Sequence, residues 1–211
     1  GYNTGTSIST GVTNTLIGGL AGDAITTGSG NTAVGYQALT TEDENGTTTA
    51  IGQKALMLQN AGTESYNTAV GYDAGQQVTT GNENTLIGGR AGEALTTGGG
   101  NVALGKSALA DETTGGNNVA IGKDSMSSSQ LSQNNVAVGI QTLQNVTNAS
   151  LKNTYNVAVG AYAGMDITTG ERNILIGGFA GDAITTGTNN VAMGYGAVSY
   201  THLTLPTIYS V

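Results

Sequence analysis

Apolar and polar positions along this chain recur with a fixed 17-residue period. All but one of the repeats open with Asn, and the opening residue is followed by a variable residue, Ala or Leu, an aliphatic residue or Met, and Gly. Of the ten steps between openings, eight have this length, and the other two are longer, one by two residues and one by four. A short fixed period indicates one supersecondary unit per repeat, stacked on its neighbours. The openings are Asn14, Asn31, Thr48, Asn67, Asn84, Asn101, Asn118, Asn135, Asn156, Asn173 and Asn190.

Each unit is numbered here from position 1, its opening residue, to position 17. Positions 2 to 5 form a short extended stretch that ends in Gly, and positions 13 to 15 often read Thr-Thr-Gly, a turn signal. A unit of this length holds two or three short strands and their turns. The pattern therefore predicts an all-β fold, a parallel β-solenoid (β-roll) of about eleven coils. We expect residues 1–197 to form it, beginning and ending in mid-coil.

Positions 9 and 12 predict how the interior is packed. Where position 9 is Gly, position 12 is large and aliphatic, and where position 9 is large, position 12 is polar. The rule holds in all eight 17-residue units. Close-packed interiors penalise both overfilling and voids, so the two positions are expected to share one interior volume. The side chains expected in this column are Ile25, Leu39, Val78, Leu95, Leu109, Met126, Ile167 and Ile184.

The extended stretch carries two further expectations. Asn opens ten of the eleven units, and its stacked amides could form a hydrogen-bonded Asn ladder, with a simple turn-forming role as the alternative. Side chains alternate along a strand, so positions 2 and 4 share one face and positions 3 and 5 the other. We expect the β-branched face to fill the coil and the Ala and Gly face to admit a neighbouring chain. The alternative is that these small residues fit a tight turn within one chain.

Composition and charge exclude several classes of function. The net charge of −8 argues against binding nucleic acid through its phosphates. The absence of Cys excludes disulfides and thiolate metal sites, and there is no apolar run of membrane-spanning length. The only His, His202, lies outside the repeats, which leaves the many hydroxyls without an evident base. The sequence therefore predicts no enzyme and no cofactor.

Two binding chemistries remain open as alternatives. Asp23, Glu93 and Asp182 share position 10, in a context that distantly echoes a calcium-binding nonapeptide. Because the acid recurs in only three coils, these residues are weak metal candidates and a solvated turn is the simpler interpretation. The Thr pairs at positions 13 and 14, such as Thr96 and Thr97, could form a flat ice-binding array. Intervening coils without the pair break that array.

The repeat pattern stops after Ala197. Residues 198–211 follow no phase of the repeat and contain the only Pro of the chain. Residues 198–207 resemble the translation of a transposon-type sequencing adapter. We therefore expect 198–211 to be a non-native tail, with a genuine C-terminal cap as the alternative.

The repeats resemble those of two families of surface fibres. NTAVGYQAL at 31–39, NTAVG at 67–71, NVAIG at 118–122 and NVAVG at 156–160 are similar to repeats in the heads of trimeric autotransporter adhesins. They are more similar still to repeats of phage tail-fibre proteins. The resemblance covers residues 1–197 and implies a left-handed β-roll in a homotrimer, acting as a rigid shaft or adhesive head.

The resemblance also implies a location and a partner. The location would be extracellular, on a virion tail fibre or a bacterial cell surface, and the partner a glycan or protein receptor on a host surface. The alternatives are a calcium- or ice-binding extracellular solenoid, or the non-catalytic repeat region of a fibre that carries a separate glycan-cleaving domain.

The two long units predict where recognition occurs. Extra residues cannot join a coil of fixed size, so they are expected to bulge as surface loops. Each long unit ends in a Tyr, which offers an apolar face and a hydroxyl to a receptor. The alternative is that these are tolerated insertions. The expected receptor-contact residues are Gln59, Asn60, Tyr66, Asn148, Lys152 and Tyr155.

Overall fold

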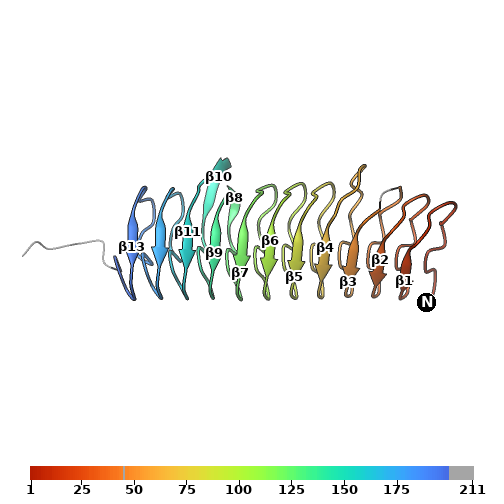
Figure 1. Ribbon diagram of the computed structural model, residues 1–211, viewed down its shortest axis with the longest axis horizontal. Helices are drawn as coiled ribbons and strands as arrows, with labels where there is room; N and C mark the ends of the chain where they lie inside the picture. Colours follow the sequence, from red (N-terminus) through yellow and green to blue (C-terminus); the bar gives the residue numbers. More distant parts are fainter. Residues whose placement is uncertain (45, 200–211) are drawn as a thin grey trace, which may run out of the picture.

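The chain forms a parallel β-solenoid, seen in a computed structural model that describes residues 1–44 and 46–199 (Figure 1). Ten turns connect the eleven strands of one sheet, and the described residues form no helix. The predicted fold class is therefore confirmed. The strands are β1 (Thr15–Ile17), β2 (Thr32–Val34), β3 (Thr49–Ile51), β4 (Thr68–Val70), β5 (Thr85–Ile87), β6 (Val102–Leu104), β7 (Val119–Ile121), β8 (Gln130–Gln133), β9 (Val136–Val138), β10 (Thr147–Asn153), β11 (Val157–Val159), β12 (Ile174–Ile176) and β13 (Val191–Met193).

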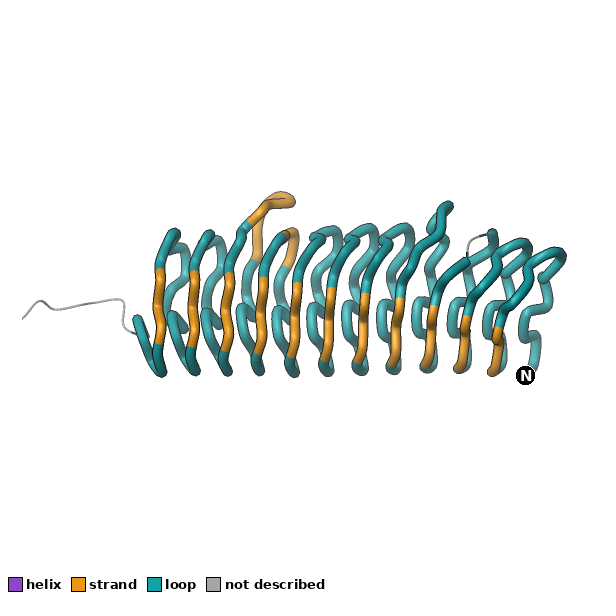
Figure 2. The backbone as a smooth tube through the Cα atoms, viewed as in Figure 1, coloured by secondary structure: helices purple, strands orange, loops and turns teal. Residues whose placement is uncertain are grey.

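Most coils contribute a single three-residue strand, fewer than the two or three expected (Figure 2). The long sheet runs β1-β2-β3-β4-β5-β6-β7-β9-β11-β12-β13, and β8 pairs with β10 in a separate two-stranded sheet. The turns nevertheless hydrogen-bond from coil to coil. The N–H of Leu109, for example, donates to the carbonyl of Ser125 at 2.9 Å. Stacking thus satisfies backbone groups that isolated turns would expose to water.

Positions 9 and 12 both contribute to the interior, but they do not exclude one another as predicted: Leu143 and Val146 of the second long unit are both fully buried. Leu39, Leu109 and Met126 are fully buried, as are Ile25 and Leu95 in the coils with Gly at position 9. A Cβ atom added at Gly22 would lie 2.8 Å from Ile25 Cδ1 and 2.8 Å from Leu16 Cδ2. In coils with Gly at position 9, a side chain at that position would therefore overlap its neighbours. Where position 9 is large, position 12 is buried as well, as Glu42 and Glu112 are, so both positions point into the interior. Position 3 also points into it, which explains why Leu occurs at position 3 only in coils with Gly at position 9.

Gly is invariant at position 5 because of the backbone within one chain. These glycines have φ between 122° and 144°, where residues with a side chain are strained. A Cβ atom at Gly105 would also lie 2.6 Å from the carbonyl oxygen of Gly122 in the next coil. The expectation that position 5 admits a neighbouring chain is therefore wrong, and the alternative of a tight intrachain fit holds.

The expected orientation of the strands is wrong as well. Position 3 faces inward, and Ala33, Ala103 and Leu175 are fully buried, whereas positions 2 and 4 face outward. The physical reason is volume: the turn residues at positions 8, 9 and 12 already occupy the narrow interior. One strand side chain per coil fits beside them, and the β-branched residues are turned to the outside.

The predicted tail, 198–211, lies outside the described residues except for Val198 and Ser199. Val198 occupies position 9 with the φ of 59° that this position adopts in other coils. The hydroxyl of Ser199 donates to the carbonyl of Gly196 at 2.8 Å. His202 and the only Pro lie beyond this point.

Candidate functional site

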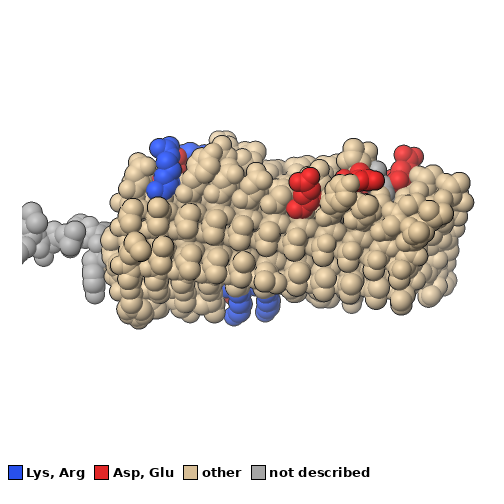
Figure 3. Space-filling view, viewed as in Figure 1, with Lys and Arg blue, Asp and Glu red and all other residues tan. Residues whose placement is uncertain are grey.

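The solenoid has one broad uncharged surface, which we call the outer sheet face. It consists of the side chains at positions 2 and 4 of the eleven strands, none of which is charged. In Figure 3 charged side chains gather along the two edges of this face and leave its middle free. Its most exposed aliphatic residues are Ile17, Ile51, Ile87, Leu104, Val159, Ile174, Ile176, Val191 and Met193.

The extent of this surface is unusual for a single soluble chain. Eleven strands at about 4.8 Å spacing make a face about 50 Å long. Large contiguous apolar patches mark interaction sites on soluble proteins, because exposure of apolar area to water is unfavourable. The outer sheet face is therefore the strongest candidate for an interaction surface in the described chain.

The two long units protrude at the edge that we call the loop edge, at the top of Figure 2. Both insertions follow position 12: the two extra residues of the first lie within 60–64, and the four extra residues of the second lie within β10. Both insertions occupy the same corner of the coil, so they project in the same direction. The prediction that extra residues form surface loops is confirmed for these two segments.

Gln59, one of the predicted receptor contacts, is not on the surface. It occupies position 12 and is fully buried. Its side-chain nitrogen lies 2.9 Å from both Glu42 Oε2 and Thr48 Oγ1, and its oxygen accepts from Asn67 Nδ2 at 2.8 Å. The prediction was wrong because the bulge begins one residue later, at Asn60.

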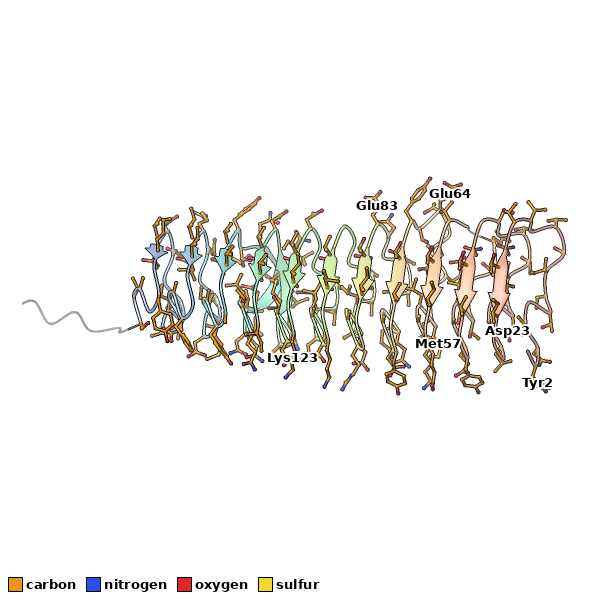
Figure 4. All side chains as sticks on the ribbon, turned by 60° about the horizontal axis from the view of Figure 1, so that its bottom comes forward. Tyr2, Asp23, Met57, Glu64, Glu83 and Lys123 are labelled. Carbon is orange, nitrogen blue, oxygen red and sulfur yellow. The ribbon has the colours of Figure 1, made fainter. Side chains whose placement is uncertain are left out.

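Asn60 and Tyr66 are exposed on the loop edge, as predicted. The hydroxyl of Tyr66 donates to the carboxylate of Glu64, and this hydrogen bond together with the negative charges of Glu64 and Glu83 raises the pKa of Tyr66. Figure 4 shows Glu64 and Glu83 on this edge and Lys123 on the opposite edge. The first loop therefore presents an uncharged aromatic ring beside two acids.

The second loop presents a different set of groups. Tyr155 is exposed, whereas Lys152 forms an ion pair with Glu171 of the next coil. The hydrogen bond from Lys152 and the nearby charge of Arg172 lower the pKa of Glu171. Asn148 is only half-buried, yet its side-chain nitrogen is enclosed without a hydrogen-bond partner. Lys152 thus serves partly to fasten the loop to the shaft.

The Asn ladder is present along the inside of the solenoid. The side-chain oxygen of Asn101 accepts the backbone N–H of Asn118 at 3.0 Å and the side-chain nitrogen of Asn118 at 3.2 Å. The side-chain nitrogen of Asn118 also donates to the carbonyl of Ser132 at 2.9 Å. Asn118 therefore links two coils and closes a turn, and the buried Asn residues of this ladder have a structural role.

Sequence reasoning missed the buried acids at position 12. Glu112 is fully buried, and its carboxylate accepts the backbone N–H groups of Thr113, Gly115, Leu131 and Ser132 at 2.8–3.1 Å. Backbone donors of this kind compensate for the loss of water around a buried charge. The available signal was the polar residue at position 12 in every coil of regular length with a large residue at position 9. A polar residue at a position that is otherwise apolar indicates a buried group with hydrogen-bond partners.

The structure does not bring the weak metal candidates together. Asp23, Glu93 and Asp182 lie in different coils, and Glu93 pairs with Arg90 at 2.6 Å. Within residues 1–44 and 46–199 no group of three or more acidic or His side chains could hold a metal ion.

The Thr pairs do not form a continuous flat array. At position 13 the hydroxyls of Thr79 and Thr96 donate to carbonyls of the following coil at 3.1 and 3.0 Å. The loop at 60–64 and strands β8 and β10 interrupt the rows. These hydroxyls therefore stabilise the stacking of the turns. The interrupted rows do not provide the continuous flat Thr surface that ice binding would need.

Comparison of the chain with protein-family models, with curated proteins and with solved structures gives no match. A search of the described residues finds no helix long and apolar enough to cross a membrane.

Proposed function

We propose that this chain is a structural and adhesive module of an extracellular fibre, a shaft or head that attaches to a host or another surface. In this proposal the chain is a homotrimer on a virion tail fibre or a bacterial cell surface. The outer sheet face joins the three chains, and the loop edges point outward to a glycan or protein receptor.

The observation that carries this proposal is the uninterrupted uncharged outer sheet face along all eleven strands. A chain with a net charge of −8 repels its own copies unless its charges lie away from the contact. On the side that Figure 3 shows, the charged side chains lie at the two edges of this face. The strand spacing repeats regularly, so another copy of the same chain offers a surface of matching period.

The proposed assembly is tested by the mass of the chain in solution. Sedimentation equilibrium at micromolar concentration should give three times the chain mass of 21.0 kDa. Burial of the apolar outer sheet face supplies the driving force for this association. A purified, folded chain that remains monomeric throughout the micromolar range would contradict the trimer.

The attachment role is tested on the two loops. Both long units are trimmed to the length of the regular unit, which removes part of 60–64 and part of β10. The trimmed chain should still assemble, because the inserted residues lie outside the coil, but it should lose binding to a glycan array and to whole cells. The loops would be tolerated insertions if the trimmed chain binds as the parent does. Tyr72→Ala, at an exposed Tyr away from both loops, is the matched control.

A further inference from the structure

The outer sheet face is divided into two chemically different halves. Position 4 is aliphatic in every coil, but position 2 changes abruptly between β5 and β6. In the first five strands of the long sheet, position 2 is always Thr, and in the last six it is always Val or Ile. The threonines are Thr15, Thr32, Thr49, Thr68 and Thr85, and the aliphatic residues are Val102, Val119, Val136, Val157, Ile174 and Val191.

The threonine half carries hydroxyls that lack partners within the chain. In the described part of the chain, no side-chain hydrogen bond is made by the hydroxyls of these five threonines, such as Thr32 and Thr68. Water can satisfy them in a free chain. When another surface covers them, each must find a new partner or remain unpaired, and an unpaired buried hydroxyl is unfavourable.

The aliphatic half has no such requirement. From β6 to β13 the outer sheet face contains no polar side-chain atom at positions 2 and 4 except the thioether of Met193. Lys106 and Lys123 follow β6 and β7 at position 6. Figure 4 shows Lys123 at the edge of the solenoid, at the rim of the face. An apolar centre with a charged rim is the arrangement typical of stable protein contacts.

This inference rests on the proposed trimer. We infer that the copies are held together mainly by a dry contact through the aliphatic half of the outer sheet face, which consists of β6, β7, β9, β11, β12 and β13. The contact through β1 to β5 is hydrated and contributes less. The partner is a second and a third copy of this chain in register, because only a copy places aliphatic strands opposite aliphatic strands and threonines opposite threonines. The assembly would therefore be anchored at its C-terminal half and looser at its N-terminal half.

Exchange of Val and Thr tests this inference, because the two side chains have nearly the same shape. One variant carries Val119→Thr, Val136→Thr and Val157→Thr in the aliphatic half. The matched variant carries Thr32→Val, Thr49→Val and Thr68→Val in the threonine half. All six residues are half-buried in the single chain, so both variants should keep the coil, which circular dichroism verifies.

The measurement is the chain concentration at which the assembly dissociates, determined by sedimentation or mass photometry. The Val→Thr variant should dissociate at a concentration at least about tenfold higher than the parent, because hydroxyls replace methyl groups in the dry contact. The Thr→Val variant should dissociate at the same concentration as the parent or a lower one.

Each outcome distinguishes this inference from the proposed function. If the parent assembles and the Val→Thr variant dissociates at an unchanged concentration, the aliphatic half is not the anchor. If the Thr→Val exchange weakens the assembly instead, the threonine half makes the specific contact and the inference is overturned. If the folded parent never assembles, the proposed trimer fails and this inference fails with it.

Discussion

Gly105→Ala should destabilise the solenoid by roughly 3 kcal/mol or more, one of the largest effects available from a single added methyl group. Gly105 has a φ of 139°, which residues with a side chain rarely adopt. The new Cβ atom would lie 2.6 Å from the carbonyl oxygen of Gly122, a backbone atom of the next coil that cannot rotate away. The strained backbone φ and the steric collision of the Cβ atom therefore both destabilise the Gly105→Ala variant.

Gly89→Ala is the matched control for this experiment. Gly89 is at position 6, has no atom within 4 Å of an added Cβ, and does not have positive φ. Its replacement should be nearly neutral, or stabilising by up to about 1 kcal/mol, because Ala restricts the unfolded chain. Urea denaturation at one fixed protein concentration measures both variants, since assembly makes apparent stability depend on concentration. Equal midpoints for the two variants would show that position 5 does not require Gly.

Leu109→Ala should lower the free energy of unfolding by about 2–4 kcal/mol, the usual range for emptying a fully buried position. Leu109 is fully buried at position 9, and the other buried apolar residues of its coil, Ala103 and Ala108, are too small to fill the space. The narrow coil limits how far the surrounding backbone can collapse into the cavity. The loss should be local, because each coil of a solenoid contacts only its neighbours.

Leu151→Ala provides the comparison for Leu109→Ala. It removes the same atoms from a side chain that is 50% exposed in β10, and it should cost less than about 0.5 kcal/mol. Denaturation gives the two free energies, and amide hydrogen exchange should show the faster opening in the Leu109→Ala variant confined to the coils next to Leu109. A cost for Leu109→Ala no larger than that for Leu151→Ala would mean that the column at positions 9 and 12 does not hold the coil together.

The coil follows from the repeat pattern alone. A short fixed period with Gly always at position 5 predicts a parallel solenoid, since stacking in register is the arrangement that gives each unit the same neighbours. The alternation of the large apolar residue between positions 9 and 12 predicted that both positions face the interior, and residues such as Leu109 and Glu112 are both buried there. The Asn ladder was predictable because Asn recurs at position 1 of nearly every unit, which stacks the side-chain amides on one another.

Which side of each strand faces inward depends on the packing of the whole coil, and the repeat pattern does not predict it. Alternation separates position 3 from positions 2 and 4 but does not say which side is enclosed, and the larger β-branched residues were the natural choice for the interior. The turn residues at positions 8, 9 and 12 already fill the narrow coil, so the strand contributes only a small residue such as Ala103. Gln59, which was predicted to lie on or beside a loop, is buried because position 12 faces the interior of the coil. The aliphatic residues at positions 2 and 4 face outward and form the outer sheet face. Burial depends on the volume enclosed by the whole coil, and no single stretch of sequence contains that quantity.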